Sequence, residues 1–152
     1  MLKKLTVIML ALIILAMPVI SFASPEIIGT NATTSADYLM EIKNPASASS
    51  ATSTQTYLVS AVALENTVIT LYSYSADTGM YHKMYTNGAP VESVVGASGL
   101  FAKQITLGKG SNKLLVHATR ADNEYKNSFL EITLLGEGFL SKIKTFAQNL
   151  FN

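Results

Sequence analysis

The sequence predicts an all-β protein, an antiparallel β-sandwich, with one amphipathic α-helix after it. Short stretches in which apolar and polar residues alternate recur between residues 56 and 135, and a period of two is typical of strands with one buried face. Turn-forming residues separate these stretches, and no helical pattern lies between them, which favours antiparallel pairing. After Gly138 the apolar residues change to helical spacing.

Residues 1–23 are typical of a secretory signal peptide. Lys3 and Lys4 precede an apolar run over residues 5–20, and a Ser-Phe-Ala sequence ending at Ala23 places small residues where signal peptidase reads. We expect cleavage after Ala23, with a retained N-terminal anchor as the alternative. Removing 23 of the 152 residues leaves 129, enough for one domain with its own core.

Composition excludes several classes of function. Without Lys3 and Lys4 the 11 basic side chains become 9, against 10 acidic ones, so no net positive field attracts nucleic acid. Charged residues make up 14% of the chain, against about 25% in average soluble domains. The chain has no cysteine, which excludes disulfides and thiol chemistry. We expect a protein that is secreted or lies on the extracellular face of the cell envelope.

The first part of the mature chain has a weak pattern. Residues 24–41 are expected to form an N-terminal arm, with a candidate edge strand over residues 37–42. Pro45 then interrupts, because proline cannot donate to a strand ladder. Residues 46–55 are small and polar without periodicity, so we expect a surface loop or a flexible tether there.

The main β region, residues 42–135, begins its alternation at Thr56. Ile69 and Leu71 are the expected inward pair of the second strand. Further strands are expected over residues 68–74, 81–86, 91–95 and 128–135.

Residues 96–119 are predicted to form a hairpin around a glycine-rich turn at residues 108–112. Lys103 falls on an inward position, so we expect either a β-bulge or a place at the sheet rim. Leu115, His117 and Thr119 are expected to face outward or toward an edge. The residues expected to be buried are Phe101, Ile105, Leu107, Leu114, Val116 and Ala118.

Residues 98–101 and 107–118 resemble the bacterial immunoglobulin-like (Big-type) domains of exported and cell-surface proteins. Those domains carry a similar succession of glycine, aromatic residue, strand, glycine-rich turn, Asn and alternating aliphatics ending in Ala. Residues 57–61 and 67–72 look like the paired strands that precede this motif, although Ala61 stands where glycine is common. The resemblance covers residues 42–135, and it implies an immunoglobulin-like sandwich with a noncatalytic role.

Tyrosines cluster around the turn at residues 76–80. A hairpin there sets Tyr74 opposite Tyr81, Tyr72 opposite Lys83, and Thr70 opposite Tyr85. The outward face then becomes a candidate site for an extracellular or envelope protein or a glycan, because aromatic rings stack on sugars and anchor partners. Alternatively, these aromatic pairs stabilise the sheet alone. The candidate partner-binding residues are Tyr72, Tyr74, Tyr81, Lys83 and Tyr85.

Catalytic and metal-binding patterns find no support in the sequence, so we predict neither an enzyme nor a cofactor. The sequence around Ser98 lacks the second spacer of a nucleophile elbow. His82 and His117 have no neighbouring ligands at metal-site spacing. Three acids in expected loops, at positions Asp77, Asp122 and Glu124, are interpreted as solvated turn residues because no calcium-loop series is present.

Residues 136–152 are predicted to form an amphipathic helix that is too short to be stable alone in water. Three surfaces remain open for its apolar stripe: its own sandwich, a partner or second copy, and a membrane surface. The leading interpretation is a noncatalytic binding or structural module, and the alternative is a peripheral membrane or assembly factor acting through this helix. The candidate membrane or oligomer contacts are Phe139, Leu140, Ile143, Phe146, Leu150 and Phe151, with Ala147 on the same stripe.

Overall fold

The computed structural model describes residues 24–120 and 123–150 of the chain. The predictions for residues 1–23, Asp122 and Phe151, and for the side chain of Leu140, lie outside what it describes.

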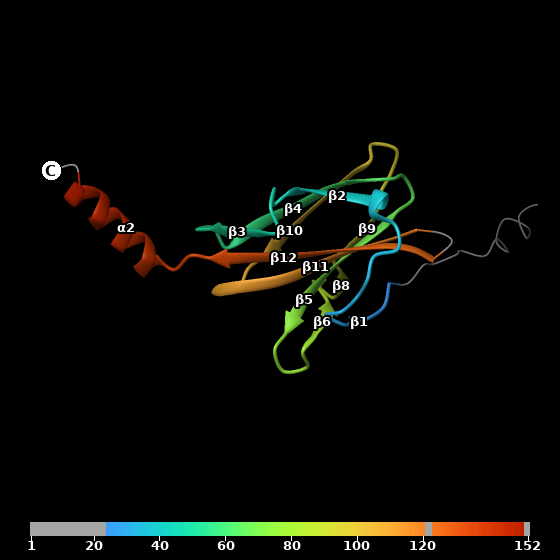
Figure 1. Ribbon diagram of the computed structural model, residues 1–152, viewed down its shortest axis with the longest axis horizontal. Helices are drawn as coiled ribbons and strands as arrows, with labels where there is room; N and C mark the ends of the chain where they lie inside the picture. Colours follow the sequence, from blue (N-terminus) through green and yellow to red (C-terminus); the bar gives the residue numbers. More distant parts are fainter. Residues whose placement is uncertain (1–23, 121–122, 151–152) are drawn as a thin grey trace, which may run out of the picture.

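The described chain is mostly β-strand, arranged in two main sheets, with one helix at its C-terminal end (Figure 1). The larger sheet has the order β1-β6-β5-β11-β12-β3, with β9 paired to β5, and the smaller has the order β10-β4-β2. The larger sheet comprises β1 (Ile27–Ile28), β3 (Ser49–Thr52), β5 (Val68–Ser75), β6 (Met80–Lys83), β9 (Glu92–Val94), β11 (Gly110–Arg120) and β12 (Glu124–Leu134). The other elements are the short 3-10 helix η1 (Asp37–Leu39), β2 (Met40–Asn44), β4 (Thr56–Ala63), β10 (Leu100–Thr106), the hairpin strands β7 (Tyr85–Thr86) and β8 (Ala89–Pro90), and helix α2 (Glu137–Leu150).

The core lies between the facing sides of the two sheets. Alternate residues of β4 and β10 meet alternate residues of β5, β11 and β12 there, as their period-two patterns predict. All the predicted inward residues lie in this core, with Leu134 packed against it half-buried. They are Ile69, Leu71, Phe101, Ile105, Leu107, Leu114, Val116 and Ala118, and Leu130 and Ile132 of β12 lie in the core beside them.

The predicted hairpin over residues 96–119 is wrong, because its two strands belong to different sheets. β10 pairs with β4, whereas β11 pairs with β5 and β12. The connection is a corner held by the side chain of Asn112, whose Oδ1 accepts a hydrogen bond from the Gly108 amide at 2.7 Å. Its Nδ2 donates to the carbonyls of Gly108, Gly110 and Ile132 at 2.9–3.1 Å. Gly110 has a φ of +81°, which side chains rarely tolerate.

Lys103 lies at the rim of the smaller sheet, which is the second of the two arrangements expected for it. The register between β10 and β4 runs without interruption from Leu100 opposite Val62 to Thr106 opposite Thr56, so there is no bulge. β10 is an edge strand, and Lys103 is half-buried at this rim, where its ammonium can reach water.

Part of the expected loop at residues 46–55 is a strand. β3 pairs with β12 in parallel, with Ser49 opposite Glu131 and Thr52 opposite Leu134. Its residues are exposed or half-buried, and they are small and polar, so the strand carries no alternation by which the sequence could reveal it. The backbone ladder along the edge of β12 is what orders this segment.

The N-terminal arm, defined here as residues 24–39, lies across the outer face of the larger sheet. β1 pairs with the edge strand β6, and Ile28 and Ala32 pack onto Tyr72, Tyr81 and Leu115. The predicted edge strand over residues 37–42 is η1 followed by β2. The prediction that Leu115 and His117 are outward is right about the face of β11, but the arm covers that face, and both side chains are buried.

Helix α2 follows β12 and extends beyond the end of both sheets (Figure 1).

Candidate functional site

The tyrosine hairpin has the register predicted from its turn over most of its length. Tyr72 lies opposite Lys83 and Tyr74 opposite Tyr81. The predicted pairing of Thr70 with Tyr85 is wrong, because β6 ends at Lys83 and β9 takes its place, with Glu92 opposite Thr70.

The five candidate residues do not form one exposed stripe. Tyr72 is fully buried and Tyr81 is 6% exposed, both beneath the N-terminal arm. The Tyr72 hydroxyl donates a hydrogen bond to the Pro25 carbonyl at 2.5 Å. Tyr74 and Tyr85 remain exposed. The predicted recognition face is therefore corrected to a face that the chain covers with its own N-terminal arm.

Lys83 anchors the arm through a cluster of polar contacts. Its Nζ donates to the Ser24 carbonyl at 2.6 Å and contacts Glu26 Oε1 at 3.0 Å. The Ser24 hydroxyl contacts the Thr70 hydroxyl at 2.7 Å, and Thr70 donates to Glu92 Oε2 at 2.8 Å. Because the proton of Thr70 is committed to Glu92, Ser24 donates the first of these bonds.

The same cluster sets the protonation of its neighbours. The Tyr85 hydroxyl, 2.7 Å from Glu26 Oε2, and the Lys83 ammonium lower the pKa of the Glu26 carboxyl. Burial, together with the charges of Glu92 and Glu26, raises the pKa of Tyr72. The contacts of Lys83 with the Ser24 carbonyl and Glu26 fasten the arm to the edge of the larger sheet. Sequence reasoning missed Ser24, Glu26 and Glu92, because each is more than 20 residues from the strand residue that it meets.

Neither histidine lies in a metal site. His117 Nδ1 lies 2.7 Å from Asn127 Oδ1, the ring packs edge-on against Tyr72 with centroids 6.0 Å apart, and burial lowers the pKa of His117. His82 Nε2 lies 2.7 Å from the Thr78 hydroxyl. Within residues 24–120 and 123–150, no three His, Cys, Asp or Glu side chains converge.

The other residues weighed as metal ligands or as a nucleophile are Asp77, Glu124 and Ser98. Glu124 accepts a hydrogen bond from the Tyr38 hydroxyl, and Asp77 is exposed in the turn between β5 and β6. Ser98 is also exposed, and its Oγ accepts a hydrogen bond from the Leu100 amide at 3.3 Å. The Ser98 hydroxyl therefore caps a turn rather than facing a base.

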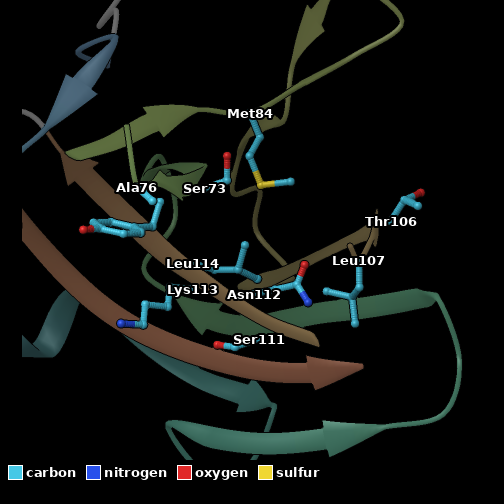
Figure 2. A pocket seen from close by; sticks show the side chains of 10 residues that line it. Ser73, Ala76, Met84, Thr106, Leu107, Ser111, Asn112, Lys113 and Leu114 are labelled. Atoms are coloured by element: carbon cyan, nitrogen blue, oxygen red, sulfur yellow. The ribbon is translucent and has the colours of Figure 1, made fainter. Parts of the chain in front are cut away.

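A cavity of about 510 Å³ opens where the corner before β11 meets the β5–β6 hairpin (Figure 2). Three of its polar side chains have partners: Ser111 donates to Glu131 at 2.6 Å, Asn112 holds the corner, and Lys113 Nζ lies 5.6 Å from the centre of the Tyr74 ring. Met84 and Leu114 supply apolar surface. The cavity pairs no nucleophile with a base, so it has the character of a recess between the sheets.

Helix α2 presents its apolar stripe to solvent. Phe139, Ile143, Phe146 and Leu150 are each between 50% and 67% exposed, and the helix stands clear of the sheets (Figure 1). The structure therefore does not place this stripe against the chain's own β-structure.

Among the helices that the structure describes, none has the length and apolarity to cross a bilayer. No protein-family model matches the chain, and no curated protein matches it.

Proposed function

We propose that this protein is a secreted or envelope-associated immunoglobulin-like module with a noncatalytic role, and that α2 attaches the module where it acts. The observation that carries the proposal is the position of α2. A helix of 14 residues is marginal in water without a covering surface, yet its apolar stripe is exposed beyond the end of the β-structure.

The β-structure supports the fold named in this proposal. Two facing sheets enclose one core, and the larger sheet ends in the parallel pair of β3 and β12. A region of about 100 residues with two packed sheets is the size and architecture of an immunoglobulin-like sandwich. The resemblance of residues 98–101 and 107–118 to bacterial domains of this kind points the same way.

The surroundings of the polar residues support a noncatalytic role. Lys83 is engaged in fastening the arm, Asn112 in holding the corner before β11, and Ser98 in capping a turn. Such contacts stabilise a scaffold, and a catalytic site needs a nucleophile and a base that converge on open space.

Deleting residues 136–152 tests the proposal. We expect the β-module to keep its melting temperature within about 3 °C, since α2 contributes little burial to the core. The exported truncated protein should move from the cell envelope to the medium. A fall in melting temperature of more than about 10 °C would show that the helix is part of the domain's stability and overturn the proposal.

A further inference from the structure

We infer that the partner of α2 is an anionic lipid surface, on which the helix lies parallel to the membrane plane. This inference rests on the proposed function and names the surface that the exposed stripe meets. Three features support it: the positions of the lysines on the helix, the length of the apolar repeat, and the distribution of charge over the molecule.

The two lysines of α2 flank its apolar stripe. On a helix with 100° per residue, the described apolar side chains occupy an arc of about 100° around the axis. Phe146 lies at one border of this arc and Ala147 at the other. Lys142 lies about 40° beyond one border and Lys144 about 60° beyond the other. A lysine on each side of an apolar stripe lets both ammonium groups reach lipid headgroups while the stripe enters the acyl region.

The polar side of the helix carries one charge, Glu137 in its first turn, which lies about 80° beyond the border of the stripe at Ala147. Ser141, Thr145, Gln148 and Asn149 occupy the rest of that side. Ser141 and Thr145 bond back to the helix backbone, at 3.0 Å each. That side therefore suits water above a membrane, with the Glu137 carboxylate pointing away from the lipid.

The apolar repeat is short for self-association. Phe139, Ile143, Phe146 and Leu150 follow spacings of four, three and four residues, which is only about two heptads. A stable coiled coil usually needs at least about three. A lipid surface needs no register and accepts a short stripe, so it fits this length better than a second helix does.

The distribution of charge over the molecule favours binding of an anionic surface at the end that carries α2. Lys109 precedes Gly110, which pairs with Leu134 at the end of β12, so this lysine stands beside the root of α2. Together with α2, residues 107–110 carry three lysines and Glu137, a side-chain charge of +2. The other residues from Ser24 onward carry six basic and nine acidic side chains, a charge of −3. An anionic surface therefore attracts the end with α2 and repels the rest.

Flotation with lipid vesicles tests the inference on the chain from Ser24 to Asn152. Residues 24–150 contain both sheets and the core, whereas residues 5–20 would enter lipid by their own apolarity; thermal unfolding first verifies that the shortened chain is folded. We expect binding to vesicles of phosphatidylcholine with phosphatidylglycerol, and much weaker binding to phosphatidylcholine alone. Binding should weaken as salt is added.

Two substitutions on the same helix add the same charge on different faces. Ile143→Glu lies in the apolar stripe and should weaken binding by more than about tenfold. Gln148→Glu lies on the polar face and should change it by less than about threefold. Replacing Lys142 and Lys144 together by Gln should weaken binding to the anionic vesicles by about thirtyfold.

Equal binding by the Ile143→Glu and Gln148→Glu variants would overturn the inference. Light scattering that shows an oligomer, lost in Ile143→Glu, together with no vesicle binding would overturn it in favour of a second copy. In that case α2 would still be an attachment element and the proposed function would stand. The melting temperature of the chain without residues 136–152 separately decides that function.

Discussion

Asn112 fixes the connection between the two sheets through one side chain. Its amide contacts the backbone of Gly108, Gly110 and Ile132, so it fixes the corner before β11 and ties it to β12. The amide hydrogen bonds direct β11 into the larger sheet, away from β10. A glycine-rich sequence that resembles a hairpin turn therefore serves as a crossing between layers.

His117 is a buried side chain whose protonated form the fold disfavours. It lies on the outer face of β11, beneath the arm, against Tyr72 and near Tyr125, with the Lys83 charge also acting on it. Asn127 Nδ2 donates to the Thr33 carbonyl at 2.6 Å, so its Oδ1 is left to accept from the imidazole Nδ1–H. Burial lowers the pKa of His117 because it disfavours the imidazolium.

This environment predicts a pH-dependent stability. The unfolded chain takes up a proton on His117 near its ordinary pKa of about 6.5, while the folded protein does so only at lower pH. The free energy of unfolding should therefore fall as pH drops from about 7.5 to about 5.5, by at most about 1.4 kcal/mol per pH unit. Chemical denaturation across this range measures the slope.

The His117→Gln variant should flatten this slope. His82→Gln is the matched control, because His82 sits in a partly exposed hairpin with Thr78 as its partner, and that variant should keep the slope of the parent. An unchanged slope in His117→Gln would contradict the assignment of the pH effect to this buried ring.

At the scale of elements, the N-terminal arm covers part of the outer face of the larger sheet. It adds β1 to the edge of the larger sheet and buries Tyr72, Tyr81 and Leu115 on a face that would otherwise be exposed. Polar contacts from Lys83 to Ser24 and from Asn127 to Thr33 fasten it at its start and in its middle. The arm is therefore part of the folded unit.

Substitution of the two isoleucines of β1 measures how much the arm contributes to the free energy of unfolding. Ile28 is 8% exposed and Ile27 is 48% exposed. Ile28→Ala should lower the free energy of unfolding by about 2–3 kcal/mol, because it leaves a gap over Tyr72 and Tyr81. Ile27→Ala should cost less than about 0.5 kcal/mol. Similar losses in the two variants, measured by urea unfolding, would show that the arm does not seal this face.

Elements with a buried side were predictable from sequence, and those without one were not. Alternation located most strands and the core residues, and the turn at residues 76–80 predicted the register of Tyr72 and Tyr74. β3 escaped because neither of its faces enters the core. The connection from β10 to β11 was predicted as a hairpin, which is wrong. Two strands with one buried face show the same alternation whether they pair in one sheet or lie in two sheets that face each other. Whether the outer tyrosines are exposed depends on the arm, which is distant in sequence.

At the scale of the whole molecule, the chain separates a covered β-module from an uncovered helix. The β-module has an apolar core between the sheets and a second apolar cluster under the arm, although single side chains such as Val94 and Leu100 are exposed on its surface. Helix α2 leaves its own exposed and carries a lysine on each side of the stripe. Such a division fits a rigid body that is held at a surface by one terminal element.

Hydrogen exchange of the chain from Ser24, with and without anionic vesicles, tests this account most directly. In solution we expect the amides of residues 138–150 to exchange rapidly, while those of β5 and β11 stay protected. Vesicles containing phosphatidylglycerol should slow exchange in residues 138–150 and leave the β-module unchanged. Protection of residues 138–150 in the monomer without vesicles, or no protection when vesicles are added, would contradict the account.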